Sequence, residues 1–203
     1  VKYKFPLISI CITHYNAKDS IKACLESALA QTYPNFEILL IDDCSSFDAV
    51  NYLHSLHALN RDVKFFFNKC NLGVAACRNI LLKQANGEYV VFFDDDDESV
   101  PERLLTQYER LINYQKKYQI KSPLICHSAR LQRMEGCKEH YIPTMGTKEE
   151  RISPNGHDVA KRILYGKSIK DGFGACATCS QMGRRQDYID LGGFDENLRR
   201  SED

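Results

Sequence analysis

The sequence lacks several features that would assign it to a class at once. No apolar run approaches the roughly 18 residues that a membrane-spanning helix needs. The formal net charge is zero, from 27 acidic and 27 basic residues. This balance argues against a protein built to bind nucleic acid or anionic membranes in bulk. The first 13 residues also lack the layout of a secretory signal, because their apolar run is too short.

The common phosphate-binding and metal-binding motifs are absent or incomplete. No G-x-G-x-x-G follows the first predicted strand, and Gly166-Lys167-Ser168 resembles a P-loop end except that Lys161 replaces its leading glycine. The cysteines number nine, and several lie in apolar patterns, which favours reduced, buried thiols. Cys176 and Cys179 have metal-ligand spacing but no second pair, so a structural role is the better interpretation.

An alternation of strand and helix patterns fills the first 117 residues. Short runs of β-branched and aromatic residues each lead into a polar loop and then a helical pattern. The predicted strands are 7–13, 36–41, 63–67 and 89–93, and the predicted helices are 21–29, 48–59, 74–85 and 101–117. Such alternation is typical of an α/β fold, with a mostly parallel nucleotide-binding sheet flanked by helices and joined by right-handed crossovers.

The second half is less regular, and we expect a mixed arrangement there. No internal repeat or clear linker is visible, so we expect a single domain over 1–203. The predicted elements are a strand at 124–131, a possible partner strand at 137–142, a helix at 157–164, a strand at 174–179 and a helical turn at 187–191.

Five consecutive carboxylates, Asp94 to Glu98, follow the fourth predicted strand. Two unit charges about 4 Å apart interact by roughly 4 kcal/mol at an effective dielectric of about 20. A hard divalent cation such as Mg²⁺ or Mn²⁺ would neutralise such a run, whereas an acidic turn in water is the alternative. Polar loops at 14–16, 42–43 and 71–73 end the other strands. Ligands of parallel sheets bind at these carboxyl ends, so the loops predict one shared crevice.

Two residues of this crevice have open interpretations. Asp43 is suited to a ribose hydroxyl or a base N–H, but it is equally suited to a turn or cap with Ser45. Arg78, just inside the third predicted helix, is suited to a phosphate or a base, or to a surface salt bridge.

Taken together, blocks along nearly the whole chain resemble the inverting family-2 glycosyltransferases of GT-A fold. The blocks occur in the order of that family, and together they are far more specific than any one of them. They are 6–16, 26–27 with 31–38, 42–45, 71–73 with 76–79, 85–89, 93–97, 192–196 and 202–203. The resemblance implies transfer of a sugar from a nucleoside-diphosphate donor to an acceptor hydroxyl, with inversion at the anomeric carbon.

The resemblance also implies roles for residues on the donor side. Thr13 and Tyr15, with Asn16 beside them, would line the base and ribose site. Asp43 would hold the base edge, and Arg78 would stand beside the nucleotide. On this interpretation 1–117 is the nucleotide-sugar half, and 118–203 is an incomplete acceptor-side half.

The acidic run then becomes the D-x-D motif of the family. Asp94 and Asp95 would face the donor, with Asp95 near the ribose, and Asp96 would be the direct ligand of Mn²⁺ or Mg²⁺. Asp203 would be the general base that deprotonates the acceptor. Transfer by a single displacement needs a cation that stabilises the departing diphosphate, and it needs no nucleophile from the protein.

Three departures from the family pattern qualify these assignments. Asp95 replaces the usual small residue, Cys44 replaces the usual glycine, and the sequence ends at the proposed base, so we expect it to be part of a longer protein. We expect a saccharide or lipid-linked saccharide acceptor, no nucleic-acid partner, and a cytoplasmic location with possible peripheral association at the inner membrane face. The rival hypotheses are a sugar-nucleotide nucleotidyltransferase and a non-catalytic nucleotide-sugar-binding module.

Overall fold

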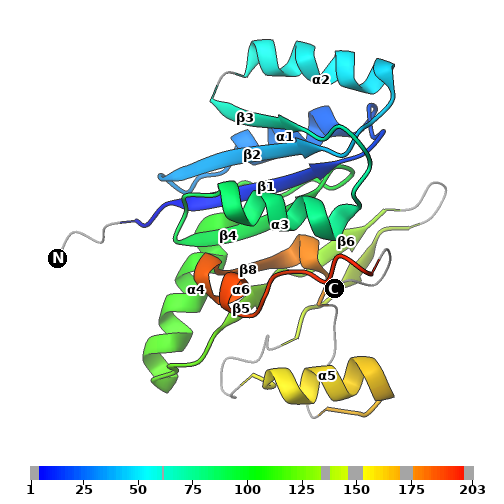
Figure 1. Cartoon of the computed structure of the whole chain (residues 1–203). Helices are drawn as coiled ribbons and strands as arrows, with labels where there is room; N and C mark the ends of the chain where they lie inside the picture. The colour runs from blue at the N-terminus through cyan, green and yellow to red at the C-terminus, as the bar shows by residue number, and fades with distance from the viewer. Residues whose placement is uncertain (1–4, 61, 134–137, 146–152, 170–175, 199–203) are drawn as a thin grey trace.

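The structure is a computed structural model that describes residues 5–60, 62–133, 138–145, 153–169 and 176–198 (Figure 1). Its first half is the predicted alternation of strands and helices. The elements are β1 (Ile8–His14), α1 (Ile21–Leu29), β2 (Phe36–Asp42), α2 (Phe47–Leu59), β3 (Val63–Phe67), α3 (Val74–Gln84), β4 (Tyr89–Asp94) and α4 (Arg103–Tyr118). The predicted α/β class is therefore confirmed, and most bounds agree within two residues.

The main sheet has the strand order β3-β2-β1-β4-β8-β5. Strands β1 to β4 are mutually parallel, and β8 (Gln181–Arg184) runs antiparallel to both β4 and β5 (Ile125–His127). In register, Thr13 lies opposite both Ile41 and Asp94. The loops that follow β1, β2 and β4 therefore leave the sheet at the same edge.

Each face of the sheet is covered by helices, which explains why the strands read as nearly continuous apolar runs. On one face, Ile8, Ile10 and Ile12 pack with buried side chains of α1, α2 and α4. On the other face, Cys11 and its neighbours on β2 and β4 pack with α3 and with Tyr188 of α6 (Arg185–Asp190). The alternation of side chains along β1 thus supplies two separate cores.

The amino ends of the strands are tied together around the carboxylate of Glu37. It accepts hydrogen bonds from Ser9 Oγ at 2.6 Å, from Lys64 Nζ at 2.7 Å and from the Asn86 N–H at 2.7 Å. The Gly87 N–H donates to Ser9 Oγ at 2.9 Å, and a Cβ on Gly87 would lie only 2.6 Å from Ser9. Several residues of the family pattern are therefore structural, at the end of the sheet away from the predicted crevice.

The second half differs from the predictions in two places. The predicted strand 124–131 is two strands, because β5 joins the main sheet whereas β6 (Arg130–Gln132) pairs with β7 (His140–Ile142). The pairing of these segments is as predicted, although Cys137 lies outside the described residues. The predicted strand 174–179 is wrong where the structure describes it: Thr178–Ser180 is a 3₁₀ turn, and the strand follows at β8.

The remaining elements agree more closely with the sequence. The predicted helix 157–164 is α5 (Gly156–Tyr165), and the helical turn at 187–191 is α6. Helix α4 begins at Arg103 rather than at the predicted Pro101. None of the described helices combines the length and apolar character that crossing a membrane would require.

Candidate functional site

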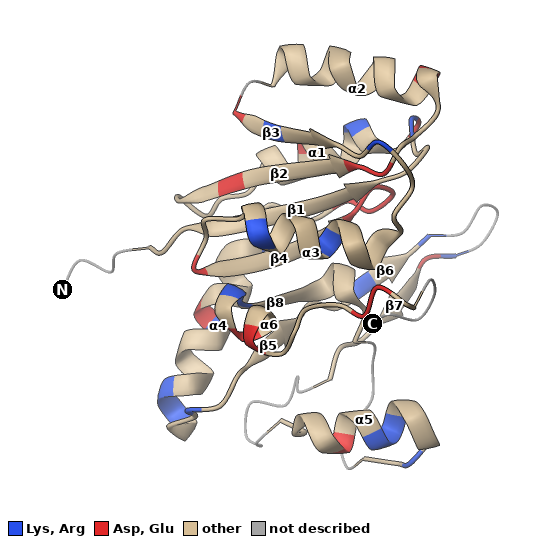
Figure 2. Ribbon diagram, in the orientation of Figure 1, with Lys and Arg blue, Asp and Glu red and all other residues tan. Residues whose placement is uncertain are grey.

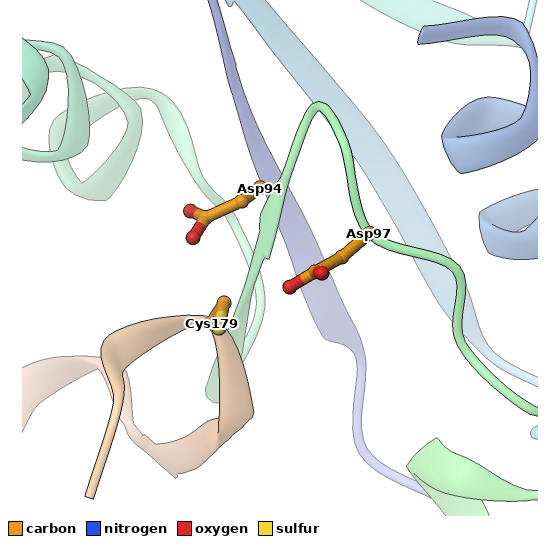
Figure 3. Close-up of side chains that lie close together, drawn as sticks. All are labelled: Asp94, Asp97 and Cys179. Carbon is orange, nitrogen blue, oxygen red and sulfur yellow. The ribbon is translucent and has the colours of Figure 1, made fainter. Parts of the chain in front are cut away.

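The acidic loop begins at the last residue of β4 and is closed by a turn. The Asp97 N–H donates to the Asp94 carbonyl oxygen at 3.2 Å, so the first and fourth residues of the turn come together. Ligand atoms of Asp94, Asp97 and Cys179 all lie within 4.8 Å of one another (Figure 3). Cys179 comes from the segment just before β8. Asp96, the predicted metal ligand, is exposed and lies outside this three-residue group, so its role stays a prediction.

The donor atoms of this group fit a hard divalent cation. Carboxylate oxygens are the ligands that Mg²⁺ and Mn²⁺ prefer. Burial raises the pKa of the Cys179 thiol to about 12, and the nearby Asp94 and Asp97 charges add to this effect. The thiol is therefore protonated at neutral pH, and it does not present the thiolate that a softer ion selects. Cys176 lies elsewhere, with its sulfur 3.9 Å from that of Met145, so the two cysteines do not act as a ligand pair.

Arg78 of α3 lies beside the first carboxylate of the loop. Its Nη2 donates to Asp94 Oδ1 at 3.2 Å, and its guanidinium is 5.4 Å from the centroid of the Phe194 ring. Arg78 is only 4% exposed, so the alternative of a surface salt bridge is excluded. Burial raises the pKa of Asp94, and the Arg78 charge opposes that shift. The pair presents a cation and an anion together at the carboxyl end of β4.

The loop after β1 connects the acidic loop to the loop after β2. The Tyr15 N–H donates to Asp95 Oδ2 at 2.9 Å, while the Tyr15 side chain is 53% exposed. The Asn16 N–H donates to Ser45 Oγ at 2.9 Å, and Asn16 Oδ1 accepts from the Ser46 N–H at 2.8 Å. The backbone of this loop is thus fixed, and the Tyr15 ring is left available to solvent.

Asp43 fixes the loop between β3 and α3. Its Oδ1 accepts from Asn68 Nδ2 at 2.9 Å and from the Leu72 N–H at 2.8 Å, and its Oδ2 accepts from the Gly73 N–H at 2.8 Å. The predicted alternative of a turn with Ser45 is wrong for Asp43. Its neighbour Asp42 takes that role, because Asp42 accepts from both the N–H and the hydroxyl of Ser45.

Asp42 also positions a residue that the sequence analysis did not assign. His14 Nδ1 lies 2.8 Å from Asp42 Oδ1, and both side chains are buried. Among the described residues, His14 Nε2 has no hydrogen-bond partner although it is buried. The sequence analysis placed His14 in the polar loop after the first predicted strand, but no pattern pointed to its partner.

Two further side chains support the site from a distance. Gln31 accepts from the Leu104 N–H at 3.1 Å and donates to the Val100 carbonyl at 2.9 Å, which fixes the exit of the acidic loop. Asn79 donates to the Phe194 carbonyl at 2.9 Å and accepts from the Phe194 N–H at 2.8 Å. Both residues lie in the family blocks, and their function in the structure is to position loops.

All but one of the predicted site residues lie in the part of the chain that the structure describes. Thr13, half-buried in β1, lies at the same edge of the sheet as the loops of Tyr15, Asp43 and the acidic run. Figure 2 shows acidic segments at the edge to which β1 and β2 point. The predicted base, Asp203, lies outside the described residues. What the structure brings together is an acidic loop, a buried arginine and an exposed aromatic ring.

Comparisons with known proteins agree with this arrangement. WfaP from Escherichia coli, named a UDP-Glc:alpha-D-GlcNAc-diphosphoundecaprenol beta-1,3-glucosyltransferase, is 42% identical over 101 residues, covering 50% of this chain and 39% of WfaP. The chain thus spans about two fifths of that relative.

Two kinds of solved structure share the fold at low identity. The Staphylococcus aureus TarS structure with UDP-GlcNAc has a TM-score of 0.67 at 23% identity, covering 97% of this chain and 50% of TarS. The Pyrobaculum calidifontis mannosyltransferase PcManGT, in complex with GDP-Man and Mn²⁺, has a TM-score of 0.59 at 17% identity. The match covers 97% of this chain and 49% of PcManGT.

The family is shown by the match of a family model to more than half of the chain. That model, described as glycosyl transferase family 2, covers residues 9–125, from β1 through β4 and α4 to the start of β5. The matched segment includes the loops that follow β1, β2, β3 and β4. The chain therefore belongs to glycosyl transferase family 2 and has the GT-A fold.

Proposed function

We propose that this chain is the donor-binding part of a metal-dependent inverting glycosyltransferase. It would transfer a sugar from a nucleoside diphosphate to an acceptor hydroxyl in a single displacement. The observation that carries the proposal is the link between the Arg78–Asp94 ion pair and the hydrogen-bonded loops after β1 and β2 at one sheet edge. The complexes of TarS with UDP-GlcNAc and of PcManGT with GDP-Man support a nucleotide-sugar donor.

The donor half of the site has chemistry suited to a nucleotide. The buried Asp43 carboxylate is held in place by Asn68 Nδ2, by the Leu72 and Gly73 N–H groups and by a hydrogen bond with the Cys77 thiol. In the proposal its carboxylate would hold the base edge of the nucleotide. The exposed Tyr15 ring would pack against the base, with Thr13 and Asn16 on either side of it in the chain. Arg78 would offer its charge to the diphosphate.

The acidic loop supplies the cation site in this proposal. Asp94 and Asp95 would face the donor, and Asp96, with Asp94 and Asp97 nearby, would hold Mn²⁺ or Mg²⁺. A bound divalent cation stabilises the negative charge that develops on the departing diphosphate. Asp203 would accept the proton of the acceptor hydroxyl, and no covalent intermediate is required.

The acceptor is proposed from relatives alone. WfaP is named for transfer to a diphosphoundecaprenol-linked sugar, so we propose a lipid-linked saccharide acceptor. A membrane-bound acceptor and a cytoplasmic donor would place the reaction at the inner face of the membrane.

Calorimetric titration tests the donor proposal on this chain. We expect UDP, GDP or dTDP to bind more tightly with Mn²⁺ than without it. Tyr15→Ala should weaken binding by roughly tenfold, since stacking of a base on an aromatic ring contributes about 1–3 kcal/mol. Leu59→Ala is the control, because Leu59 is exposed at the far end of α2. Absence of binding by all three nucleotides would overturn the proposal.

Transfer itself is tested in the full-length natural protein. Asp203→Asn there should retain donor binding and lose turnover, because the base is removed while the size of the side chain is kept. Unchanged turnover would remove Asp203 from the base role. Binding without turnover in the unaltered protein would favour a non-catalytic module, and release of a sugar nucleotide as product would favour a nucleotidyltransferase.

A further inference from the structure

Arg103, the first residue of α4, is a buried cation whose hydrogen-bond acceptors are all neutral. It is 8% exposed. Its guanidinium donates to the carbonyls of Phe92 at 3.2 Å and Cys179 at 2.6 Å. It also donates to Ser99 Oγ at 2.9 Å and Gln107 Oε1 at 3.1 Å. Within the part of the chain that the structure describes, no carboxylate lies at ion-pair distance from Arg103.

This cation therefore has its counter-charge at longer range. Three of its four acceptors flank the acidic loop: Phe92 precedes it in β4, Ser99 follows it, and Cys179 lies against Asp94 and Asp97. Burial lowers the pKa of Arg103 to about 10, and the charges of Asp97 and Asp94 oppose that shift. These acids are thus the carboxylates that stabilise the buried guanidinium.

The position of Arg103 at the start of α4 also affects its electrostatic environment. A helix N-terminus carries a partial positive charge, so a cation in the first turn of a helix is normally unfavourable. Helix α4 begins with Arg103 and has no acidic residue in its first turn, while the exposed Glu102 at its N-cap offsets part of this positive charge. Arg103 therefore places a buried positive charge next to the acidic loop, and this charge opposes the binding of a second cation there.

We propose that Arg103 is an internal counter-charge that weakens divalent-cation binding to the empty acidic loop, so that the cation binds together with a diphosphate. This inference rests on the proposed function for the diphosphate, although not for the cation. Without the nucleotide, the cation is repelled by Arg103 and attracted by carboxylates that are already partly neutralised. The negative charges of the diphosphate shift this balance, and the cation and nucleotide therefore bind cooperatively.

The test is the affinity of the chain for Mn²⁺, followed by the electron paramagnetic resonance signal of free Mn²⁺. Arg103→Met removes the charge, and we expect Mn²⁺ to bind roughly tenfold more tightly than to the wild type without nucleotide. Arg103→Lys keeps the charge and should bind Mn²⁺ like the wild type. Lys116→Met removes the same charge about 20 Å away along α4 and should change nothing.

The opposite results have a clear meaning. If Arg103 were purely structural, both Arg103 variants would bind Mn²⁺ more weakly than the wild type, and that result would overturn the proposal. An unchanged Mn²⁺ affinity in Arg103→Met would overturn it as well. The wild type provides a test that does not depend on whether a variant folds. Its affinity for Mn²⁺ should rise at least tenfold in saturating UDP. Equal Mn²⁺ affinities with and without bound UDP would overturn the proposal. If UDP fails to bind at all, the proposed function fails, while the nucleotide-free comparison still tests the role of Arg103.

Discussion

At the scale of single residues, two positions other than glycine in the loops of the site adopt the left-handed backbone conformation. Asn16 has φ of 56° and Cys44 has φ of 61°. Asparagine is one of the few residues with a Cβ that visit this region, and Asn16 is held there by hydrogen bonds with Ser45 and Ser46 of the loop after β2. Cysteine has no such compensation. The glycine that the family usually has at position 44 is therefore explained by backbone geometry.

Replacing Cys44 by glycine should stabilise the chain. A left-handed conformation costs a residue with Cβ about 1–2 kcal/mol, while glycine costs about 0.5–1 kcal/mol of additional chain entropy. We expect Cys44→Gly to raise the free energy of unfolding by about 0.5–1 kcal/mol, measured by urea denaturation. Cys70→Gly is the control, since Cys70 is equally exposed without positive φ, and it should not stabilise. Equal effects of the two substitutions would contradict this explanation.

At the scale of elements, the connection between α3 and the segment after α6 holds the two halves of the site together. Asn79 makes its two hydrogen bonds with the backbone of Phe194, and its Nδ2 also lies 2.8 Å from Glu196 Oε1. Gly193 must lack a side chain, because a Cβ there would lie 2.4 Å from Asn79 Oδ1. The glycine-rich turn thus packs directly on α3 beside Arg78.

Removing the Asn79 side chain should release this turn locally. Asn79→Ala leaves the N–H and carbonyl of Phe194 unpartnered, which costs about 1–3 kcal/mol when such groups are half-buried or buried. We expect hydrogen exchange of the Phe194 amide to accelerate, with the amides of β1 protected as before. Gln186→Ala on α6 removes an exposed side chain and is the control. It should leave the exchange of the Phe194 amide unchanged, and it should change the free energy of unfolding by no more than about 0.5 kcal/mol. Slow exchange at Phe194 in Asn79→Ala would show that other contacts hold the turn.

At the scale of the whole molecule, the two ends of the sheet have different tasks. The amino ends are cross-linked through Glu37, which connects β1, β2, β3 and the α3–β4 connection. The carboxyl ends carry the acidic loop and the exposed Tyr15. Burial alone would raise the pKa of Glu37, but hydrogen bonds from Lys64, Ser9 and Asn86 outweigh it and lower the pKa.

This lowered pKa predicts an acid-dependent contribution to stability. A carboxyl group whose pKa is lower in the folded state stabilises the fold above its unfolded pKa, about 4.3 for glutamate, and loses that contribution as pH falls through the folded pKa. Glu37→Gln should therefore cost roughly 2 kcal/mol at pH 7, with a difference that shrinks below about pH 4. Glu26→Gln, an exposed carboxylate, should show little difference at any pH. A pH-independent loss in Glu37→Gln would contradict the ionic explanation.

Much of the first half was predictable because local and tertiary preferences agree there. The bounds of β3 match the prediction fully, since its aromatic run is flanked by polar loops. Strand β8 was missed because only Met182 of its residues is strongly apolar, and its strand conformation follows from its place between β4 and β5. The group of Asp94, Asp97 and Cys179 was missed for a related reason, since no sequence pattern connects a loop with a cysteine so far away in the chain.

The sequence by itself determined the α/β class, the order of the first eight elements and the edge of the sheet where the site lies. It did so because hydrophobic period and turn residues are local, and because parallel strands must direct their carboxyl ends to one edge. Only the tertiary structure decided which carboxylate of the acidic run lies beside Asp94, that Asp42 rather than Asp43 holds Ser45, and that Arg103 lies buried behind the loop. Those outcomes depend on contacts between segments distant in the chain, and burial and charge at such contacts are set only when the chain has folded.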